Sequence, residues 1–273
     1  MLRPLVQRNQ AALELVRTGL SRQSQVPLQF HLNYMTTHMQ EIGNLKELAR
    51  LLVGDGISAE AEGKFDEAAR TFLDVVRLAH AVAQGGFLID ELVAQAIQAL
   101  GAGHLRRVIG QLDASVVRNL IRTLAAMDQG KDSVELIMLR ERAYFRKVHG
   151  WWLVTAPRLL GKITGKDPLR PAMQSAEATM LRGQAQLRLL ILHLALHSYK
   201  LEHGSYPAKL TGLAPGHIQA IPSDPFSDKG LVYRLENETY RLYSIGPDKK
   251  DDGGTPPTAR RAGQTPQGDI LLD

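Results

Sequence analysis

The chain has 273 residues and no cysteine, carries a formal net charge of +5, and is 44% hydrophobic but only 5% aromatic. Without cysteine, disulfides, thiolate metal sites and cysteine nucleophiles are excluded. No apolar run approaches the roughly 18 residues of a membrane span, and the first ten residues lack the apolar segment of a signal peptide. Leu, Val, Ile and Ala are the main core candidates, which favours helices over a large β-sandwich.

Helical periodicity covers most of the first half of the chain. Residues 5–20 predict a first helix, Pro27 interrupts the pattern, and from about 34 to 128 apolar residues recur at the spacing of one helix face. Because glycine weakens a helix interior, we expect breaks in this long run. They are expected at Gly54–Gly56, Gly85–Gly86 and Gly101–Gly103.

The clearest amphipathic helix is predicted over residues 65–82. The segment Gly63–Ala68 resembles the turn and second helix of a tetratricopeptide repeat, with Ala68 and Phe72 at the small and aromatic positions of that family. Only one such unit is visible, whereas a stable array needs three or more. We therefore expect a helical bundle, built either from tetratricopeptide-like hairpins or from ordinary helical hairpins.

Helix-capping residues predict two further helices. Asp113 or Ser115 is expected to cap the first of them. Asp132, with Glu135 three residues later, fits a capping box before a helix over 134–145.

A strongly basic stretch spans Arg140–Arg170, with eight Lys or Arg residues against two acidic ones. It also contains Trp151 and Trp152. One interpretation is a solvated helix face with the tryptophans in the core. The other is contact with a protein partner or a membrane surface. Nucleic acid is not expected as a partner, because the longer Lys/Arg blocks of a nucleic-acid-binding arm are missing.

The composition changes in the last third of the chain. A long helix is predicted over 176–203, and Gly204 is a natural residue to end it. Residues 204–273 hold eight of the 13 prolines and two short alternating segments, which predict a hairpin with a four-residue loop. The predicted strands are 231–235, 240–245 and, less regular, 269–272.

These elements predict a mainly α protein with a small α+β domain at its C-terminus. Residues 1–172 would form the helical bundle. Residues 173–273 would form a long helix packed on a three-stranded antiparallel sheet.

Five segments of the C-terminal part, taken in order, resemble the corresponding parts of type II secretion pseudopilins, most closely the major pseudopilin. In that family a long helix ends in a Gly-x-Tyr-Pro sequence, and a Pro-x-Asp-Pro segment, a Tyr-containing strand and an Asp-rich loop follow. The matching segments here are Leu196–Pro207, Pro222–Phe226, Tyr233, Tyr240–Gly254 and Gly268–Ile270. The resemblance implies the fold of this C-terminal module more strongly than a function.

The resemblance also implies a calcium site in the Asp-rich loop. Calcium takes six to eight oxygen ligands from carboxylates, carbonyls and water. The residues implied as side-chain ligands are Asp248, Asp251, Asp252 and Asp269. The alternative is a solvated acidic turn, which Lys249 and Lys250 between the acids would suit.

One feature of pseudopilins is missing from this chain. They begin with a Gly-Phe processing site, a Glu and a membrane helix, whereas the similar run Gly86–Glu91 lies mid-chain and is expected to be an ordinary helix start. The module therefore looks reused behind a different helical domain, as in uncharacterised bacterial proteins. By resemblance we expect a periplasmic or membrane-associated protein. In such proteins a membrane anchor can precede the helical part, and whether one belongs to this chain is left open by the sequence.

A histidine pair on the long helix is a second metal candidate. His193 and His197 are four residues apart and share one helix face, as in the His-Glu-x-x-His zinc motif. Leu194 occupies the position of the general base, and no third ligand is evident. Structural histidines are the expected interpretation.

None of the common catalytic motifs is present in the sequence, so an enzyme is not expected. The favoured hypothesis is a non-enzymatic, envelope-associated interaction protein whose partners include envelope or secretion components. Two alternatives remain, a cytoplasmic helical-repeat scaffold and a hydrolase with a site at the seam between the domains.

Overall fold

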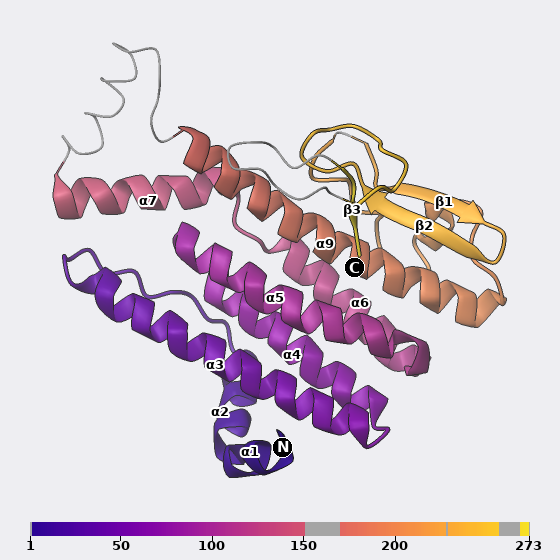
Figure 1. The fold of residues 1–273 in the computed structure, drawn as a ribbon, viewed down its shortest axis with the longest axis horizontal. Helices are drawn as coiled ribbons and strands as arrows, with labels where there is room; N and C mark the ends of the chain where they lie inside the picture. The colour runs from indigo at the N-terminus through magenta and orange to yellow at the C-terminus, as the bar shows by residue number, and fades with distance from the viewer. Residues whose placement is uncertain (1, 151–169, 228, 257–267, 273) are drawn as a thin grey trace.

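The computed structural model describes residues 2–150, 170–227, 229–256 and 268–272. This part of the chain is mainly helical with one small antiparallel sheet (Figure 1), which confirms the predicted fold class. Within it, no helix is both long and apolar enough to cross a membrane. The α-helices are α1 (Leu2–Arg8), α2 (Gln10–Leu20), α3 (Tyr34–Ala61), α4 (Phe65–Ala83), α5 (Leu88–Val108), α6 (Ala114–Gln129), α7 (Val134–His149) and α9 (Arg170–His203). The strands are β1 (Val232–Glu236), β2 (Thr239–Ser244) and β3 (Ile270–Leu271).

Helices α3, α4 and α5 lie side by side, and α4 packs against both neighbours (Figure 1). Two of the expected glycine breaks are wrong, because α3 continues through Gly56 and α5 through Gly101. A Cβ on Gly56 would overlap the buried ring of Phe72, and a Cβ on Gly101 would lie 2.9 Å from the Phe72 carbonyl oxygen. These glycines therefore let the helices approach closely and do not end them.

The expected break at Gly85–Gly86 is confirmed, since it forms the turn between α4 and α5. The Asp90 carboxylate accepts the backbone N–H of Phe87 at 2.7 Å, which caps the start of α5. The run Gly86–Glu91 is thus an ordinary helix start, as predicted.

Two details of the helix ends differ from the predictions. The predicted first helix is divided into α1 and α2 at Asn9. The capping box predicted at Asp132 is wrong by one residue, because the hydroxyl of Ser133 accepts the backbone N–H of Leu136 at 3.2 Å and caps α7. Asp132 is free to reach across to the α4–α5 turn, where its carboxylate accepts the N–H of Gly85 at 3.1 Å.

Helix α9 connects the two parts of the molecule. It begins earlier than predicted and lies between the helical layer and the sheet, contacting α5 and α6 as well as β2 and β3 (Figure 1). Leu187, Leu190, Ile191 and Leu194 are all buried, and they belong to one continuous core that extends from α4 to the sheet. Tyr233 and Leu242 of the sheet are partly buried and pack on the same core.

The sheet has the order β1-β2-β3, with all neighbours antiparallel. Tyr233 pairs with Leu242, and Ser244 at the end of β2 pairs with Ile270. The hairpin turn is shorter than the predicted loop, since pairing continues to Glu236 and Thr239 and leaves two residues between the strands. Asn237, the first of them, has φ +53°, a conformation that Asn tolerates well.

Some predictions fall on residues outside the described ranges. Trp151 and Trp152 lie there, as does most of the basic stretch after His149. The division of the chain at residues 172 and 173 stays a prediction.

Candidate functional site

The predicted metal residues come from the loop after β2 and from the start of β3. Asp269 immediately precedes β3 and is fully buried. Its Oδ2 accepts the backbone N–H of Gly254 at 2.7 Å, whereas its Oδ1 has no hydrogen-bond partner among the described residues. Burial raises the pKa of this carboxyl, and the charges of Asp251 and Asp252 raise it further. A buried, half-bonded carboxylate beside two others is the kind of group that a cation stabilises.

Asp251 lies at the surface and is already engaged by donors of the chain. Its Oδ1 accepts the Tyr243 hydroxyl at 2.8 Å and the backbone N–H of Gly253 at 3.0 Å, and its Oδ2 accepts from Arg234 at 2.9 Å. The hydrogen bond from Tyr243 is the main reason why the pKa of Asp251 is lowered. A metal at Asp251 would have to replace the exposed pair with Arg234.

Asp248 and Asp252 complete the predicted set. Asp248 accepts the backbone N–H of Lys250 with one oxygen and that of Gly268 with the other, each at 3.3 Å. Asp252 is exposed, and its backbone carbonyl accepts the Thr255 hydroxyl at 2.6 Å. Within the described ranges, no three of the four carboxylates bring their oxygens within 4.8 Å of one another. The structure thus places the acids in the same region as Asp269 without bringing the ligand atoms of any three of them together.

Asp224 is a buried acid to which the sequence analysis gave no role. It lies in the Pro222–Phe226 segment and is 2% exposed. Its Oδ1 accepts the Phe226 N–H at 2.9 Å and the Ser244 hydroxyl at 2.8 Å, and its Oδ2 accepts the Ile245 N–H at 2.9 Å. Asp224 therefore ties this segment to the end of β2 and positions the start of the acidic loop.

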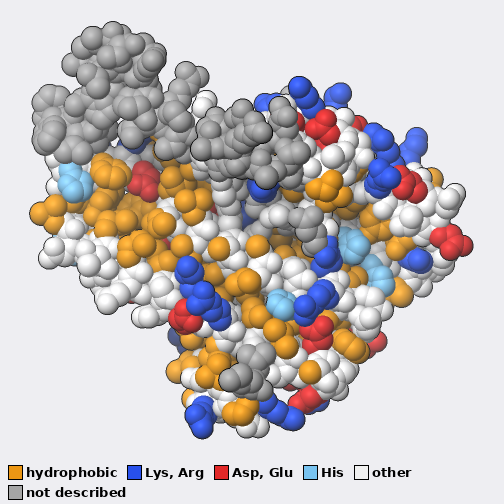
Figure 2. All heavy atoms as spheres, in the orientation of Figure 1, with side chains coloured by type: hydrophobic (Ala, Val, Ile, Leu, Met, Phe, Trp, Pro, Cys, Tyr) orange, Lys and Arg blue, Asp and Glu red, His pale blue; other side chains and the backbone are white. Residues whose placement is uncertain are grey.

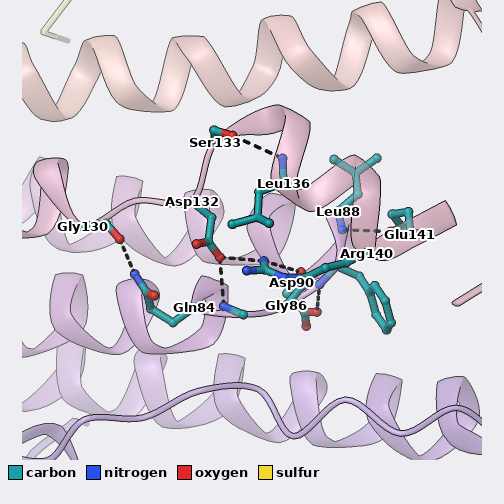
Figure 3. Close-up of polar contacts among 12 residues, drawn as sticks. Gln84, Gly86, Leu88, Asp90, Gly130, Asp132, Ser133, Leu136, Arg140 and Glu141 are labelled. Carbon is teal, nitrogen blue, oxygen red and sulfur yellow. Dashed lines mark hydrogen bonds and ion pairs between the residues drawn. The ribbon is translucent and has the colours of Figure 1, made fainter. Parts of the chain in front are cut away.

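Sequence reasoning missed a polar recess that is lined by residues of α4, the α4–α5 turn, α7 and the segment of residues 20–25. Figure 3 shows polar contacts of this region. Asp132 accepts from Arg140 at 2.7 Å, Gln84 donates to the Gly130 carbonyl at 2.7 Å, and Glu141 accepts the Leu88 N–H at 2.9 Å. The recess has a volume of about 750 Å³. It joins segments that are far apart in sequence, so no local pattern could reveal it.

Two of the arginines that line this recess are held by ion pairs. Its lining includes Arg77 and Arg140, but each is paired, with Asp74 at 3.0 Å and with Asp132 at 2.7 Å. Burial lowers the pKa of His80, the one histidine in the lining. Among the lining residues there is no nucleophile hydrogen-bonded to a base.

The histidine pair on α9 is partly buried, and its structural role stays a prediction. The Nδ1 atom of His193 contacts the hydroxyl of Tyr240, which joins α9 to β2. Burial is the main reason why the pKa of His193 falls to about 4, and burial also lowers the pKa of His197. Within the described residues, neither belongs to a group of three ligand atoms suited to a metal.

Comparison with known proteins finds no match among protein-family models, curated proteins or solved structures. The likeness of the C-terminal module to pseudopilins therefore depends on the sequence segments alone, and function has to be argued from the sites.

Proposed function

We propose that this protein is a non-enzymatic interaction protein, in which the helical part docks on a protein partner and calcium stabilises the pseudopilin-like C-terminal module. The observation that carries the docking role is the exposed apolar surface around α7. The secretion or envelope context comes from the sequence resemblance and is part of the proposal.

Large apolar side chains are exposed on α7 and on the segment that leads into α3. Leu139 is 63% exposed and Leu32 is 70% exposed. In Figure 2 apolar side chains gather in the left half of the view, over the region where α7 lies above α3 and α5 in Figure 1. The further exposed apolar residues of these two segments are Phe30, Leu136 and Phe145, and Met39 in α3 is also exposed. Contiguous apolar surface of this kind is typical of a protein interface.

The surface has an aromatic centre and a basic rim. The ring of Tyr144 is buried and lies 6.1 Å from Phe30 and 5.9 Å from Phe145 between centroids. The ammonium group of Lys147 lies 4.7 Å from the centroid of the Phe30 ring. Aromatic anchors with cationic neighbours are frequent at interface hot spots, so the fitting partner is a protein with an apolar patch bordered by acidic groups.

Site-specific photo-crosslinking in the source organism tests the docking role. We expect a benzoylphenylalanine at position 139 to give one defined protein adduct, and the same probe in place of the exposed Leu235 on the sheet to give none. The variant Leu139→Glu should abolish the adduct at position 145 and leave the melting temperature unchanged. Equal adduct patterns at 139 and 235, or adducts with lipid only, would contradict a protein interface here.

The calcium part of the proposal is supported by Asp269 and its unpartnered oxygen. Two or three carboxylates with backbone carbonyls and water suffice for calcium, so Asp269, Asp251 and Asp252 fit as ligands once Arg234 is displaced. When bound, the cation would neutralise the buried charge and fasten the loop to β3. Asp248 would hold the loop in place through its bonds near Gly268.

Calorimetric titration with Ca²⁺ tests this part separately. We expect one site per chain, and we expect Asp251→Asn and Asp252→Asn each to weaken binding. Because burial raises the pKa of Asp269, calcium affinity should fall as the pH is lowered through that pKa, where the proton competes with the metal. No heat of binding in metal-stripped protein at neutral pH would refute the calcium site and leave the docking role standing.

A further inference from the structure

The last turn of α9 and the loop after it bring three metal-ligating side chains together. Glu202 and His203 end the helix, and His217 follows in the loop after the short 3₁₀ helix at Leu210–Leu213. The ligand atoms of all three lie within 4.8 Å of one another, the only such group within the described part of the chain. Nε2 of His217 lies 3.6 Å from the Glu202 carboxylate.

Hydrogen bonds fix the orientation of both imidazoles. Nδ1 of His203 lies 3.1 Å from the carbonyl oxygen of Tyr199, so this nitrogen carries the proton and Nε2 holds the lone pair. Nδ1 of His217 lies 3.0 Å from the hydroxyl of the buried Ser198, which leaves its Nε2 to face Glu202. Metal-binding histidines are held in this way, with the second ring nitrogen bonded to a carbonyl or another polar group.

The surroundings also favour a cation bound to neutral imidazoles. The group lies at the C-terminus of a long helix, where the carbonyl dipoles favour positive charge. The side chain of His217 is only 8% exposed, so its position is held by the surrounding fold. The ring of His203 stacks on Tyr199 with 4.0 Å between centroids, which restricts its motion.

We propose that Glu202, His203 and His217 bind one divalent transition-metal ion of the zinc class. Two imidazoles and one carboxylate are borderline ligands that suit Zn²⁺ or Co²⁺, whereas Ca²⁺ prefers oxygen alone. This site is therefore independent of the calcium proposal in both position and chemistry.

Three protein ligands leave one tetrahedral position open for water or a further ligand. His217 also lines a cleft of about 620 Å³ between α6 and the loop of residues 215–219. Arg118 and Arg122 line the same cleft. The class of ligand that this open position favours is consequently a small anion, such as a carboxylate or phosphate.

Metal titrations of the full chain test the proposal, with Zn²⁺ followed by calorimetry and Co²⁺ by its visible absorption. We expect one Zn²⁺ per chain and a Co²⁺ spectrum typical of tetrahedral nitrogen and oxygen ligands. Both signals should be lost in His203→Gln, which alters an exposed residue, and in His217→Gln. Ser198→Ala keeps all three ligands and should weaken binding by about 10–100-fold, the usual effect of removing a hydrogen bond that orients a ligand.

Two control variants make the result decisive. His197→Gln, on the same helix but outside the group, should bind Zn²⁺ like the wild type, and so should Asp269→Asn, which separates this site from the calcium site. Melting curves in metal-free buffer verify that each variant is folded. Absent zinc binding in the wild type, undiminished binding in His203→Gln and His217→Gln, or loss in His197→Gln alone would overturn the proposal.

Discussion

The layer of α3, α4 and α5 and the C-terminal module are held together by different interactions. In the helical layer the closest contacts are apolar, with Phe72 fully buried against Gly56. Both regions bury carboxylates, but in the layer Asp90 caps the start of a helix, whereas in the module Asp224 and Asp269 accept backbone N–H groups from loops. The comparison teaches that a repeating apolar face can define the helices, whereas the loops around the sheet depend on single side chains.

Leu194 lies where both regions meet, so its loss should have the largest effect. It is fully buried in the core that α9 shares with the helices and the sheet. Leu194→Ala should lower the free energy of unfolding by about 2–5 kcal/mol, measured by urea unfolding. The exposed Leu201 on the same helix provides the control, and Leu201→Ala should change stability by less than about 0.5 kcal/mol. Equal effects of the two substitutions would show that Leu194 is not part of a core shared by the helices and the sheet.

Asp224→Ala tests the polar half of the comparison. The substitution leaves the N–H groups of Phe226 and Ile245 without their acceptor. Unsatisfied buried donors cost about 1–3 kcal/mol, and hydrogen exchange should become faster at these amides but not in α4. Asp248→Ala, at a more exposed carboxylate, should cost less. If Asp224→Ala lowers stability no more than Asp248→Ala does, Asp224 does not hold these loop segments together.

The glycines of α3 test the apolar half. Gly56→Ala forces a methyl group into the Phe72 ring, and such overpacking costs about 1–3 kcal/mol. Gly43 lies in the same helix with open space around it, so Gly43→Ala should stabilise the protein by about 0.5–1 kcal/mol through helix propensity. Thermal unfolding of the two variants should therefore move in opposite directions. Stabilisation by both would mean that α3 and α4 do not approach closely at Gly56.

The sequence predicted the fold class, the long helix and the three strands because periodicity is a property of many residues at once. It failed at Gly56 and Gly101, since glycine in a sequence does not tell whether a helix ends or a neighbour comes close. It placed Asp248, Asp251, Asp252 and Asp269 in one loop region by resemblance, but it could not show which of them is buried. The group formed by Glu202, His203 and His217 was missed because His217 is distant in sequence, and only the folded loop after α9 places it beside the other two.

The pH dependence of stability follows from the buried carboxyl of Asp269. Its folded-state pKa is raised above the ordinary value near 3.9, so the folded state holds this proton more tightly than the unfolded chain. Without calcium, that contribution to stability is fully present below the unfolded pKa and is lost as the pH rises through the folded pKa. Asp269→Asn removes this contribution, which a comparison of the two unfolding curves across pH 3–7 should show.

The most direct measurement compares the unfolding free energies of the wild type and Asp269→Asn in calcium and in chelator at pH 7. In chelator we predict that the variant is at least as stable as the wild type, because its amide oxygen still accepts from Gly254 and no charge is buried. In calcium at a hundredfold excess over the dissociation constant, the wild type should gain about 2.7 kcal/mol and the variant should gain nothing, which reverses the order. Identical wild-type curves in calcium and chelator would contradict the account, and the acidic loop would then be a solvated turn.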